Sequence, residues 1–295
     1  MPTVPFETRD ARIAFNRPSS NVRALKQIRR MRGGSQSHLM KCSDGNYYVV
    51  KFQNNPQHKR ILVNEFLGTR LAEKMGLPTT PCAIVRVSET LIAQTSNLVV
   101  ELPRYRVPCS AGLQFGSRYV GNPSSKTLQT LPRYELPHVS NSSAFVGMVV
   151  FDKWVCNIDG RQFLFELGHK AYTMVAIDQG FCFYGGEWNF HDAPMWGFCW
   201  DKSVYRGVKS IEDFEPWLSR LEGFNMDTIV EAADGIPTEW YDHDASALGR
   251  LLEQLNRRRK KIRQLLVEWG PKLPLIFPHW EMPKLTVPVS LRQTA

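Results

Sequence analysis

The sequence lacks long apolar runs, closely spaced cysteines and a hydrophobic N-terminal segment. No run of eighteen or more apolar residues occurs in its 295 positions, which argues against a membrane-spanning helix. The N-terminus, MPTVPFETRDAR, carries acidic residues and no apolar core, which argues against a secretory signal. The six cysteines show no CxxC spacing, and this scatter disfavours a zinc site and a disulfide framework. We therefore expect a cytoplasmic protein with reduced cysteines and no membrane partner.

Motifs of several other activities are also missing. The sequence has no Walker loop with GKS or GKT, no GxGxxG and no nucleophile elbow. It has no zinc-finger, RNP or helix-turn-helix signature. His38, His169 and His191 have no second His or Cys at metal-ligand spacing. Hydrolase chemistry and a histidine-based metal centre are therefore disfavoured.

What the sequence does have is a globular composition and a basic charge. Hydrophobic residues make up 43% and aromatic residues 11% of the chain, and 295 residues can form two lobes of one catalytic unit. The net charge is +9, and much of the excess lies in residues 26–32 and 257–263. The second run alternates with leucines at helical spacing. A solvated helix face is therefore the first interpretation, and a nucleic-acid partner is the minority alternative.

Two carboxylates flank a predicted hairpin in the second half of the chain. Residues 162–167 and 171–177 are β-prone runs separated by a turn at Gly168. The open end of such a hairpin brings Asp159 close to Asp178, nineteen positions later. Phosphoryl transfer needs one carboxylate to orient the attacking hydroxyl and another to hold the magnesium that bridges the ATP phosphates. Taken singly, each Asp also suits an ordinary turn, which is the structural alternative.

The first half of the chain predicts three antiparallel strands, at 22–30, 38–42 and 47–52. The loop between the first two is rich in small residues, which let backbone N–H groups approach phosphate oxygens closely. The small residues of this loop, which are the candidate contacts to a nucleotide, are Gly33, Gly34, Ser35 and Ser37.

Lys51 ends the third predicted strand, in YYVVKF. An ammonium there can pair with the α- and β-phosphates if a carboxylate holds it in place. Glu65 is the candidate, on a helix predicted to start with Asn55 as N-cap and Pro56 as first residue and to end at Gly76. The alternative is that Lys51 and Glu65 are ordinary solvated charges.

This ordered set resembles the HipA-like kinase family, most closely in NEFLGTRLAEKMGLP, FDKWVCNIDGRQ and VAIDQGF. The resemblance covers roughly residues 22–200. It implies that Lys51 contacts ATP phosphates, that Glu65 pairs with Lys51, that Asp159 is the catalytic carboxylate and that Asp178 ligates magnesium.

Two positions depart from the family pattern. The family often places an Asn, as a second metal ligand, five residues after the catalytic Asp, and position 164 here is Leu. Gln162 is the nearest oxygen-bearing side chain and is the substitute that we expect. Asp178 is followed by Gln179 and Gly180 rather than by Phe and Gly. The absent Asn supports a second hypothesis, in which the chain is a nucleotide-binding pseudokinase or an interaction module with the same fold.

The predicted fold is α+β, with a small antiparallel-sheet lobe that carries one helix and a larger, mainly helical lobe. The fourth strand is expected at 81–87, and 98–101 is expected to be a strand leading into a hinge where adenine would hydrogen-bond to the backbone, with Glu101 as a candidate nucleotide contact. Further helices are expected at 143–156, 211–221 and 245–268, and the aromatic stretch 181–200 is either core or a substrate-docking surface. The predicted divisions are a tail at 1–20, the small lobe at 21–102, an irregular linker at 103–140, the large lobe at 141–270 and a Pro-rich tail at 271–295.

The expected activity is ATP- and magnesium-dependent phosphoryl transfer. By the resemblance, the acceptor is a Ser or Thr hydroxyl on a protein. Ser35 and Ser37 lie in the glycine-bearing loop and are the candidate acceptors if the chain phosphorylates itself. The expected partners are ATP and a protein substrate.

Overall fold

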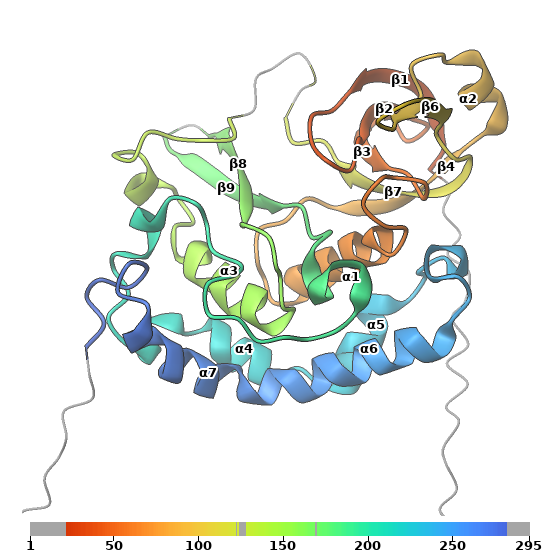
Figure 1. The fold of residues 1–295 in the computed structure, drawn as a ribbon. Helices are drawn as coiled ribbons and strands as arrows, with labels where there is room; N and C mark the ends of the chain where they lie inside the picture. Colours follow the sequence, from red (N-terminus) through yellow and green to blue (C-terminus); the bar gives the residue numbers. More distant parts are fainter. Residues whose placement is uncertain (1–21, 122, 124–127, 169, 282–295) are drawn as a thin grey trace, which may run out of the picture.

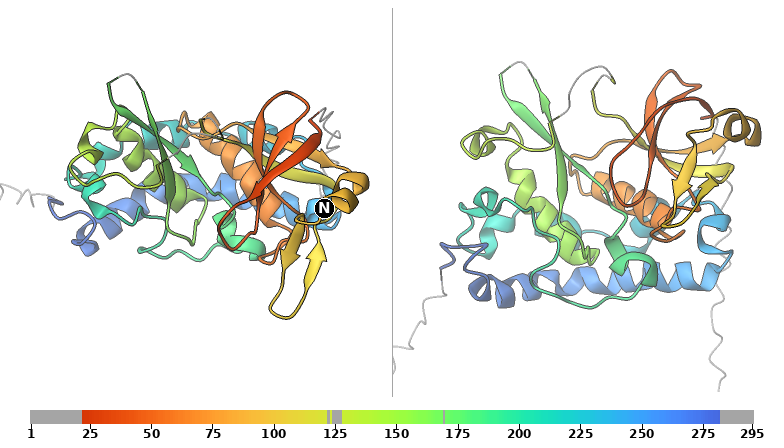
Figure 2. Two further views of the ribbon diagram at one scale, coloured as in Figure 1. Left: turned by 90° about the horizontal axis from the view of Figure 1, so that it is seen from above. Right: turned by 45° about the horizontal axis from the view of Figure 1, so that its top comes forward.

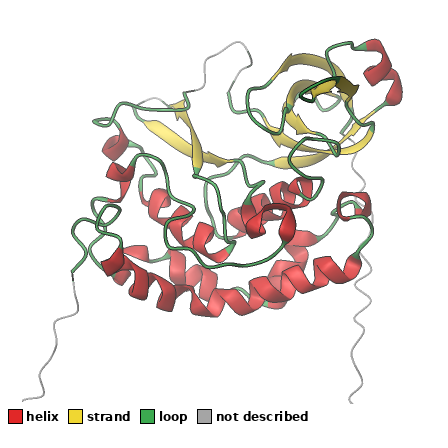
Figure 3. Ribbon diagram, viewed as in Figure 1, coloured by secondary structure: helices red, strands yellow, loops and turns green. Residues whose placement is uncertain are grey.

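The computed structural model describes residues 22–281 except 122, 124–127 and 169. A strand-rich lobe lies above a helical lobe, with α1 between them (Figure 1, Figure 3). The small lobe contains a five-stranded sheet in which all neighbours are antiparallel. In spatial order its strands are β1 (Ala24–Arg30), β2 (His38–Cys42), β3 (Tyr47–Lys51), β7 (Gly112–Arg118) and β4 (Cys82–Val87).

The alternation of side chains along β3 decides which residues reach the cleft between the lobes. Tyr48 and Val50 are buried in the core of the small lobe, whereas Val49 and Lys51 line the cleft. This is the period of two expected for a strand with two different faces. The predicted placement of Lys51 opposite Val50 is therefore confirmed.

Helix α1 (Ile61–Lys74) begins five residues later than its predicted first residue, Pro56. The side chain of Asn55 accepts hydrogen bonds from the backbone N–H groups of Gln57 and His58, at 3.0 and 3.3 Å. These bonds close a separate turn ahead of the helix, because an Asn side chain can stand in for the backbone in such turns. Of the 14 residues of α1, 11 are buried, so the helix is enclosed on nearly every side.

The chain between β4 and β7 differs from the expected hinge and linker. It forms α2 (Glu89–Gln94) and a hairpin of β5 (Val99–Glu101) and β6 (Arg106–Pro108), which projects from the lobe (Figure 2). Part of the predicted linker at 103–140 is then strand β7, which lies between β3 and β4. Gly116 allows this insertion, since a Cβ there would lie 2.6 Å from Val85 Cγ2. The chain therefore passes to the large lobe after β7 rather than after β5.

The large lobe surrounds a helical core. Its elements are η1 (Leu136–His138), α3 (Ser143–Trp154), β8 (Gln162–Leu167), β9 (Tyr172–Ile177), η2 (Cys182–Glu187), η3 (Lys202–Tyr205), η4 (Ile211–Phe214), α4 (Trp217–Glu222), α5 (Met226–Ala233), η5 (Thr238–Tyr241), α6 (Ala245–Arg258), η6 (Arg259–Lys261), α7 (Ile262–Trp269) and η7 (Gly270–Lys272). The predicted hairpin is confirmed as β8 and β9, which pair from Gln162↔Ile177 to Leu167↔Tyr172. The helices predicted at 211–221 and 245–268 are each divided, the first at Pro216 and the second at η6.

Much of the basic run at 257–263 forms hydrogen bonds and ion pairs within the large lobe rather than contacting only solvent. Arg258 is buried, donates hydrogen bonds to the carbonyls of Lys153 and Trp154 at 2.7 and 2.9 Å, and pairs with Asp192. Arg263 forms ion pairs with two glutamates of the same lobe. The interpretation of this run as a solvated face is therefore wrong for Arg258, because tertiary neighbours supply its partners.

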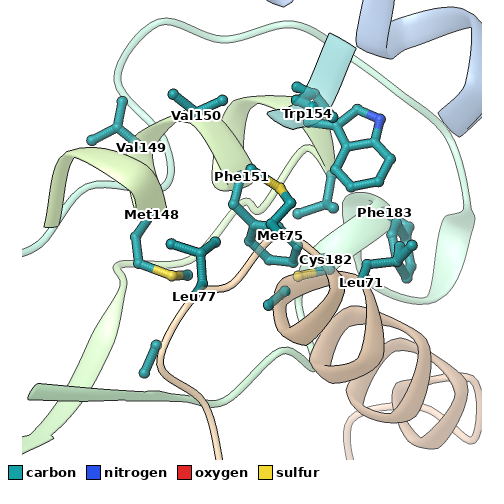
Figure 4. Packing of buried hydrophobic residues seen from close by; sticks show 14 of the residues in the cluster. Leu71, Met75, Leu77, Met148, Val149, Val150, Phe151, Trp154, Cys182 and Phe183 are labelled. Atoms are coloured by element: carbon teal, nitrogen blue, oxygen red, sulfur yellow. The ribbon is translucent and has the colours of Figure 1, made fainter. Parts of the chain in front are cut away.

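The largest core joins α1 to the large lobe (Figure 4). Leu71 and Met75 from the end of α1 belong to the same buried cluster as Phe151 and Trp154 of α3 and as Phe183. Phe198 from the aromatic stretch also belongs to it, so part of this stretch is core, as one of the two interpretations expects.

The beginning of the C-terminal tail is folded onto the large lobe. Phe277 is buried and contacts the rings of Phe198, Tyr205 and Phe214. The predicted tail at 271–295 is therefore packed at its start, while 282–295 and the N-terminal tail at 1–20 lie outside the described residues. None of the described helices combines the length and the apolar composition needed to cross a membrane.

Candidate active site

A cleft of about 610 Å³ separates the sheet of the small lobe from the loops of the large lobe that carry Asp159 and Asp178. Nine of the ten predicted site residues line it. They are Gly33, Gly34, Ser35, Ser37, Lys51, Glu65, Asp159, Gln162 and Asp178. Glu101 is not among the lining residues. The structure thus brings together groups that lie up to 145 positions apart, from Gly33 to Asp178.

Lys51 lies between two carboxylates. Its Nζ donates a hydrogen bond to Glu65 Oε1 and another to Asp178 Oδ1, the latter at 3.0 Å. The side chains of Lys51 and Glu65 are only 9% and 3% exposed, against 31% for Asp178. The second oxygen of Glu65, Oε2, accepts the backbone N–H of Gln179 at 3.0 Å. Glu65 therefore links β3 to the loop that carries Asp178.

The three charges perturb one another in a consistent way. Burial alone would lower the pKa of Lys51, but the attraction of the two carboxylates outweighs it and raises that pKa. Burial raises the pKa of Glu65 to about 7, and Lys51 opposes this rise. Burial would also raise the pKa of Asp178, but the charge of Lys51 together with hydrogen bonds from Glu65, Lys51 and the Gly180 N–H outweighs it and lowers that pKa to about 2. Asp178 is therefore the carboxylate that stays ionised and is best suited to a cation.

The backbone conformation around Asp178 allows this loop to lie close to α1. Asp178 adopts a left-handed conformation with φ of 62°, which is uncommon for a residue other than glycine. At Gly180, a Cβ would lie 2.9 Å from Ile61 Cγ2 and 3.1 Å from Glu65 Oε1. A side chain at position 180 would thus push the loop away from α1, so Gly180 is the residue that permits the Glu65 contacts.

Asp159 lies on a loop that is held by hydrogen bonds to α3. Asp152 of α3 accepts hydrogen bonds from Asn157 Nδ2 at 3.0 Å and from Arg161 Nε at 2.9 Å. Asn157 Oδ1 in turn accepts the backbone N–H of Asp159 at 3.1 Å. Arg161 also donates to the carbonyl of Asp178 at 3.2 Å. The Asp152–Arg161 pair is 0% exposed on both sides, so one buried contact holds the Asp159 and Asp178 loops together.

These supporting residues are not among the predicted site residues. In the sequence, Asp152 is only a polar residue in an apolar helix, and no motif marks Arg161. An ionisable side chain inside an apolar helix is itself a signal, because a buried charge needs a partner. Here the partner is nine positions away, in the loop of Asp159.

Gln162 lies next to Asp178, as a residue that replaces the usual Asn as metal ligand would have to. Its Nε2 lies 3.4 Å from Asp178 Oδ2. Leu164, at the position of the usual Asn, also lines the cleft but has no atom that can bind a metal. Among the described residues, no group of three or more His, Cys, Asp or Glu side chains could hold a metal ion. One carboxylate and one amide oxygen nevertheless suit magnesium, which in nucleotide sites takes its other ligands from phosphates and water.

The glycine loop is held at its base by Gln36. The side-chain amide of Gln36 accepts the backbone N–H of Glu101 and donates to the carbonyl of Glu101, both at 2.7 Å. Arg30, at the end of β1, forms an ion pair with the Glu101 carboxylate at 2.6 Å. Glu101 therefore lies behind the loop, outside the cleft. Its expected place at a hinge differs from the structure because β5 pairs with β6 and not with the main sheet.

The end of β7 supplies the part of the cleft that was expected from 98–101. Ser117, Arg118 and Tyr119 all line the cleft. The hydroxyl groups of Ser117 and Thr80 are 2.6 Å apart. The guanidinium of Arg29 lies 5.6 Å from the centre of the Tyr119 ring and donates to its hydroxyl. This wall combines polar groups with an aromatic ring, which suits the base of a nucleotide.

Comparisons with known proteins agree with this geometry. A family model described as HipA-like kinase matches residues 25–268. No curated protein matches the sequence. The chain is similar to the solved structure of hydra Fam20 with sugar, with a TM-score of 0.51 and 9% identity over 86% of this chain and 87% of that one. It is also similar to the proinflammatory kinase CtkA of Helicobacter pylori, with a TM-score of 0.51 and 13% identity over 83% and 95%. At such identities the likeness shows the fold, which is protein-kinase-like.

Proposed function

The chain belongs to the HipA-like kinase family, and we propose that it is an ATP- and magnesium-dependent kinase that phosphorylates a Ser or Thr hydroxyl of a protein. The observation that carries the proposal is the position of Lys51, held by Glu65 and Asp178 in a cleft that also contains Asp159. A lysine ordered by a carboxylate and a second carboxylate for the metal are the parts that kinase chemistry requires.

Each group then has a defined task. The Lys51 ammonium pairs with ATP phosphate oxygens, and the backbone N–H groups of the loop from Gly33 to Ser35 approach the same phosphates. Asp178 and Gln162 would hold magnesium, which supplies neutralisation of phosphate charge when it is bound. Asp159 orients the acceptor hydroxyl. The hydroxyl oxygen bonds to the γ-phosphorus, the bond from that phosphorus to the β–γ bridging oxygen breaks, and the hydroxyl proton passes to Asp159.

The buried state of the two loop serines favours a protein acceptor in trans. Ser35 and Ser37 are 9% and 4% exposed, so self-transfer to either would require the loop to leave its place. After incubation with ATP and magnesium, mass spectrometry should find neither serine modified in the bulk of the protein. Phosphate on Ser35 or Ser37 in most molecules would instead make the chain its own acceptor.

The alternative function is a nucleotide-binding pseudokinase or interaction module, and Leu164 favours it. With Leu at this position, one of the usual metal ligands is missing, and Gln162 has to replace it. The kinase and the pseudokinase share nucleotide binding and differ in transfer, whereas an interaction module requires neither. They are therefore separated by measuring both in one sample.

The test measures ATP binding with and without magnesium, and then transfer of labelled γ-phosphate to proteins of a lysate. Magnesium-dependent binding with transfer that Asp159→Asn abolishes, while binding persists, supports a kinase. Asp227→Asn, an exposed Asp on α5, is the matched control and should behave as the wild type. Binding without transfer favours the pseudokinase, and the absence of binding overturns both the kinase and the pseudokinase.

A further inference from the structure

A second cavity, of about 340 Å³, adjoins the nucleotide cleft at Asp159. Asp159, Gln162, Gln129 and Ile177 line both spaces, so the two are continuous at the candidate catalytic carboxylate. A cavity of this size is at the lower end of ligand pockets and accommodates a large side chain with its adjoining backbone. Whatever places a hydroxyl at Asp159 therefore has room to extend into this second cavity.

The floor and walls of the second cavity are predominantly apolar. Phe163 and Phe165 of β8 are each 5% exposed, and Leu131 and Leu136 are 6% and 5% exposed. The guanidinium of Arg161, which also lines the cavity, is already paired with Asp152. The surface offered to a bound group is thus mainly hydrocarbon, and burial of apolar area is the interaction that it can provide.

Trp200 lies on the rim of this cavity with 63% of its surface exposed. An indole is large and costly to leave in water, and exposed tryptophans are preferred anchors in protein recognition. The chain beneath Trp200 is fixed, because the N–H of Arg161 donates to the carbonyl of Phe198 at 3.1 Å. This bond ties the chain just before Trp200 to the loop of Asp159.

Charge at the rim is largely neutralised internally. Asp201, next to Trp200, is 3% exposed, and its carboxylate accepts a hydrogen bond from Arg133 Nε at 3.2 Å and from the N–H of Ser203 at 3.0 Å. Asp159 then remains as the exposed charge of the cavity lining. Arg133, whose side chain is 74% exposed, is paired with Asp201, so an acidic or phosphorylated neighbour of the acceptor would meet Asp159 and find no unpaired cation among the described lining residues.

We infer that this cavity is the acceptor subsite, and that it takes a protein segment in which the acceptor Ser or Thr is flanked by a large apolar side chain. Trp200 covers that side chain, and the phenylalanines of β8 form its floor. The inference rests on the proposed function, since it gives the substrate class of the same site. Trp200 is here a specificity-determining residue with no part in the chemical step.

The test uses nine-residue peptides with a central Ser flanked on both sides by Phe, Gly or Asp. Binding is measured by calorimetry in the presence of magnesium and a non-hydrolysable ATP analogue. The Phe-flanked peptide should bind about tenfold more tightly than the Gly-flanked one, since burying one aromatic side chain is worth at least that much. Trp200→Ala should remove most of this difference and leave affinity for the ATP analogue unchanged.

The control is Tyr105→Ala, which removes an aromatic side chain of similar exposure, 61%, from the loop that joins β5 and β6. This variant should keep the preference for Phe. Equal binding of the Phe- and Gly-flanked peptides by the wild type, a preference for Asp, or an unchanged preference in Trp200→Ala would each overturn the inference. Transfer of labelled phosphate to the same peptides is scored separately. Trp200-dependent binding without transfer would reject the kinase while retaining the subsite.

Discussion

Replacing Lys51 by methionine should destabilise the protein as well as inactivate it. The substitution keeps most of the side-chain volume but removes the cation that Glu65 and Asp178 share. Removing one partner of a buried pair costs about 3–5 kcal/mol, because the other charge is left uncompensated. Glu65 is 3% exposed and bears this cost, whereas Asp178 is 31% exposed and remains partly hydrated. We expect the free energy of unfolding at pH 7 to fall by about 3 kcal/mol, at the lower end of that range.

The source of this loss can be identified with a second substitution. Glu65→Gln replaces the carboxylate by an amide, which can still accept the N–H of Gln179. If the uncompensated charge is the cause, the double variant Lys51→Met/Glu65→Gln should be more stable than Lys51→Met alone by about 2 kcal/mol. A destabilisation that the second substitution does not relieve would show that lost packing, and not charge, is responsible.

The pH dependence of the Lys51→Met variant gives an independent check. Burial raises the pKa of Glu65 to about 7 even with Lys51 present, and without the cation this pKa rises further. The folded state then binds more protons than the unfolded state above pH 4.5, the ordinary pKa of this group, so stability falls as pH increases. The wild type shares this fall up to about pH 7, the pKa of its own Glu65, so the two proteins differ above that value. The variant should therefore lose stability relative to the wild type as the pH is raised from 7 to 9.

Urea unfolding followed by tryptophan fluorescence measures these differences. Lys41→Met is the matched control, because Lys41 lies on the neighbouring strand β2 with its side chain exposed. It should change the free energy of unfolding by less than about 0.5 kcal/mol. If Lys51→Met is as stable as this control at pH 7, the pair with Glu65 does not form in solution and the arrangement of the site is wrong.

Three further outcomes are expected from the same structure. Asp178→Asn should abolish the magnesium dependence of ATP binding, measured by calorimetry, because the amide cannot supply the charge that a divalent cation requires. Asn64→Ala should lower the free energy of unfolding by about 2–3 kcal/mol, since the buried Asn64 amide donates to the carbonyls of Gly180, Cys182 and Gly185 and accepts from Trp188 Nε1. Burial lowers the pKa of Lys153 from 10.5 to about 7, so between these values the unfolded state binds more protons than the folded state. The free energy of unfolding of the wild type should therefore rise from pH 7 to pH 9. Urea unfolding at the two pH values should show that Lys153→Met loses this rise.

The residues proposed to carry the chemistry could be predicted from the sequence. Lys51, Asp159 and Asp178 each follow or precede a short β-prone run, and strand ends place side chains at predictable points. Glu65 follows from the apolar stripe of its helix. These inferences depend on local patterns, which tertiary structure rarely overrides where period and turn residues agree. The structure brings all four to one cleft.

The place where the chain leaves the sheet could not be predicted from the sequence in the same way. Strand β7 pairs with β3 and β4, which end more than twenty residues before it. Its sequence, GLQFGSR, contains two glycines, which reads as a loop by propensity. The need for Gly116 appears only when Val85 and Tyr48 are placed against it, since a Cβ at this position would lie 2.6 and 3.2 Å from their side chains. The ion-pair partners of Asp152 and Arg258 could not be predicted from the sequence for the same reason, because each partner is brought close only by the fold.

The attachment of α1 determines how the site assembles. This helix packs more closely on α5 and η2 of the large lobe than on the sheet. Lys74 pairs with Glu231 of α5, and Arg70 donates to the carbonyl of Asp234 just after α5. Glu65 is therefore carried by the same body as Asp159 and Asp178, whereas Lys51 and the glycine loop belong to the sheet.

In protein kinases, the Lys–Glu pair is controlled by the position of the helix that carries the Glu. Here that helix packs mainly on the large lobe. The Lys51–Glu65 contact therefore joins the sheet to that lobe and depends on the distance between them. A nucleotide can favour the closed arrangement only through contacts that differ between the open and closed states, and the glycine loop and Lys51 provide them. A change in the approach of the sheet to the large lobe, rather than a rotation of α1, is therefore the change that we expect to break the Lys51–Glu65 contact.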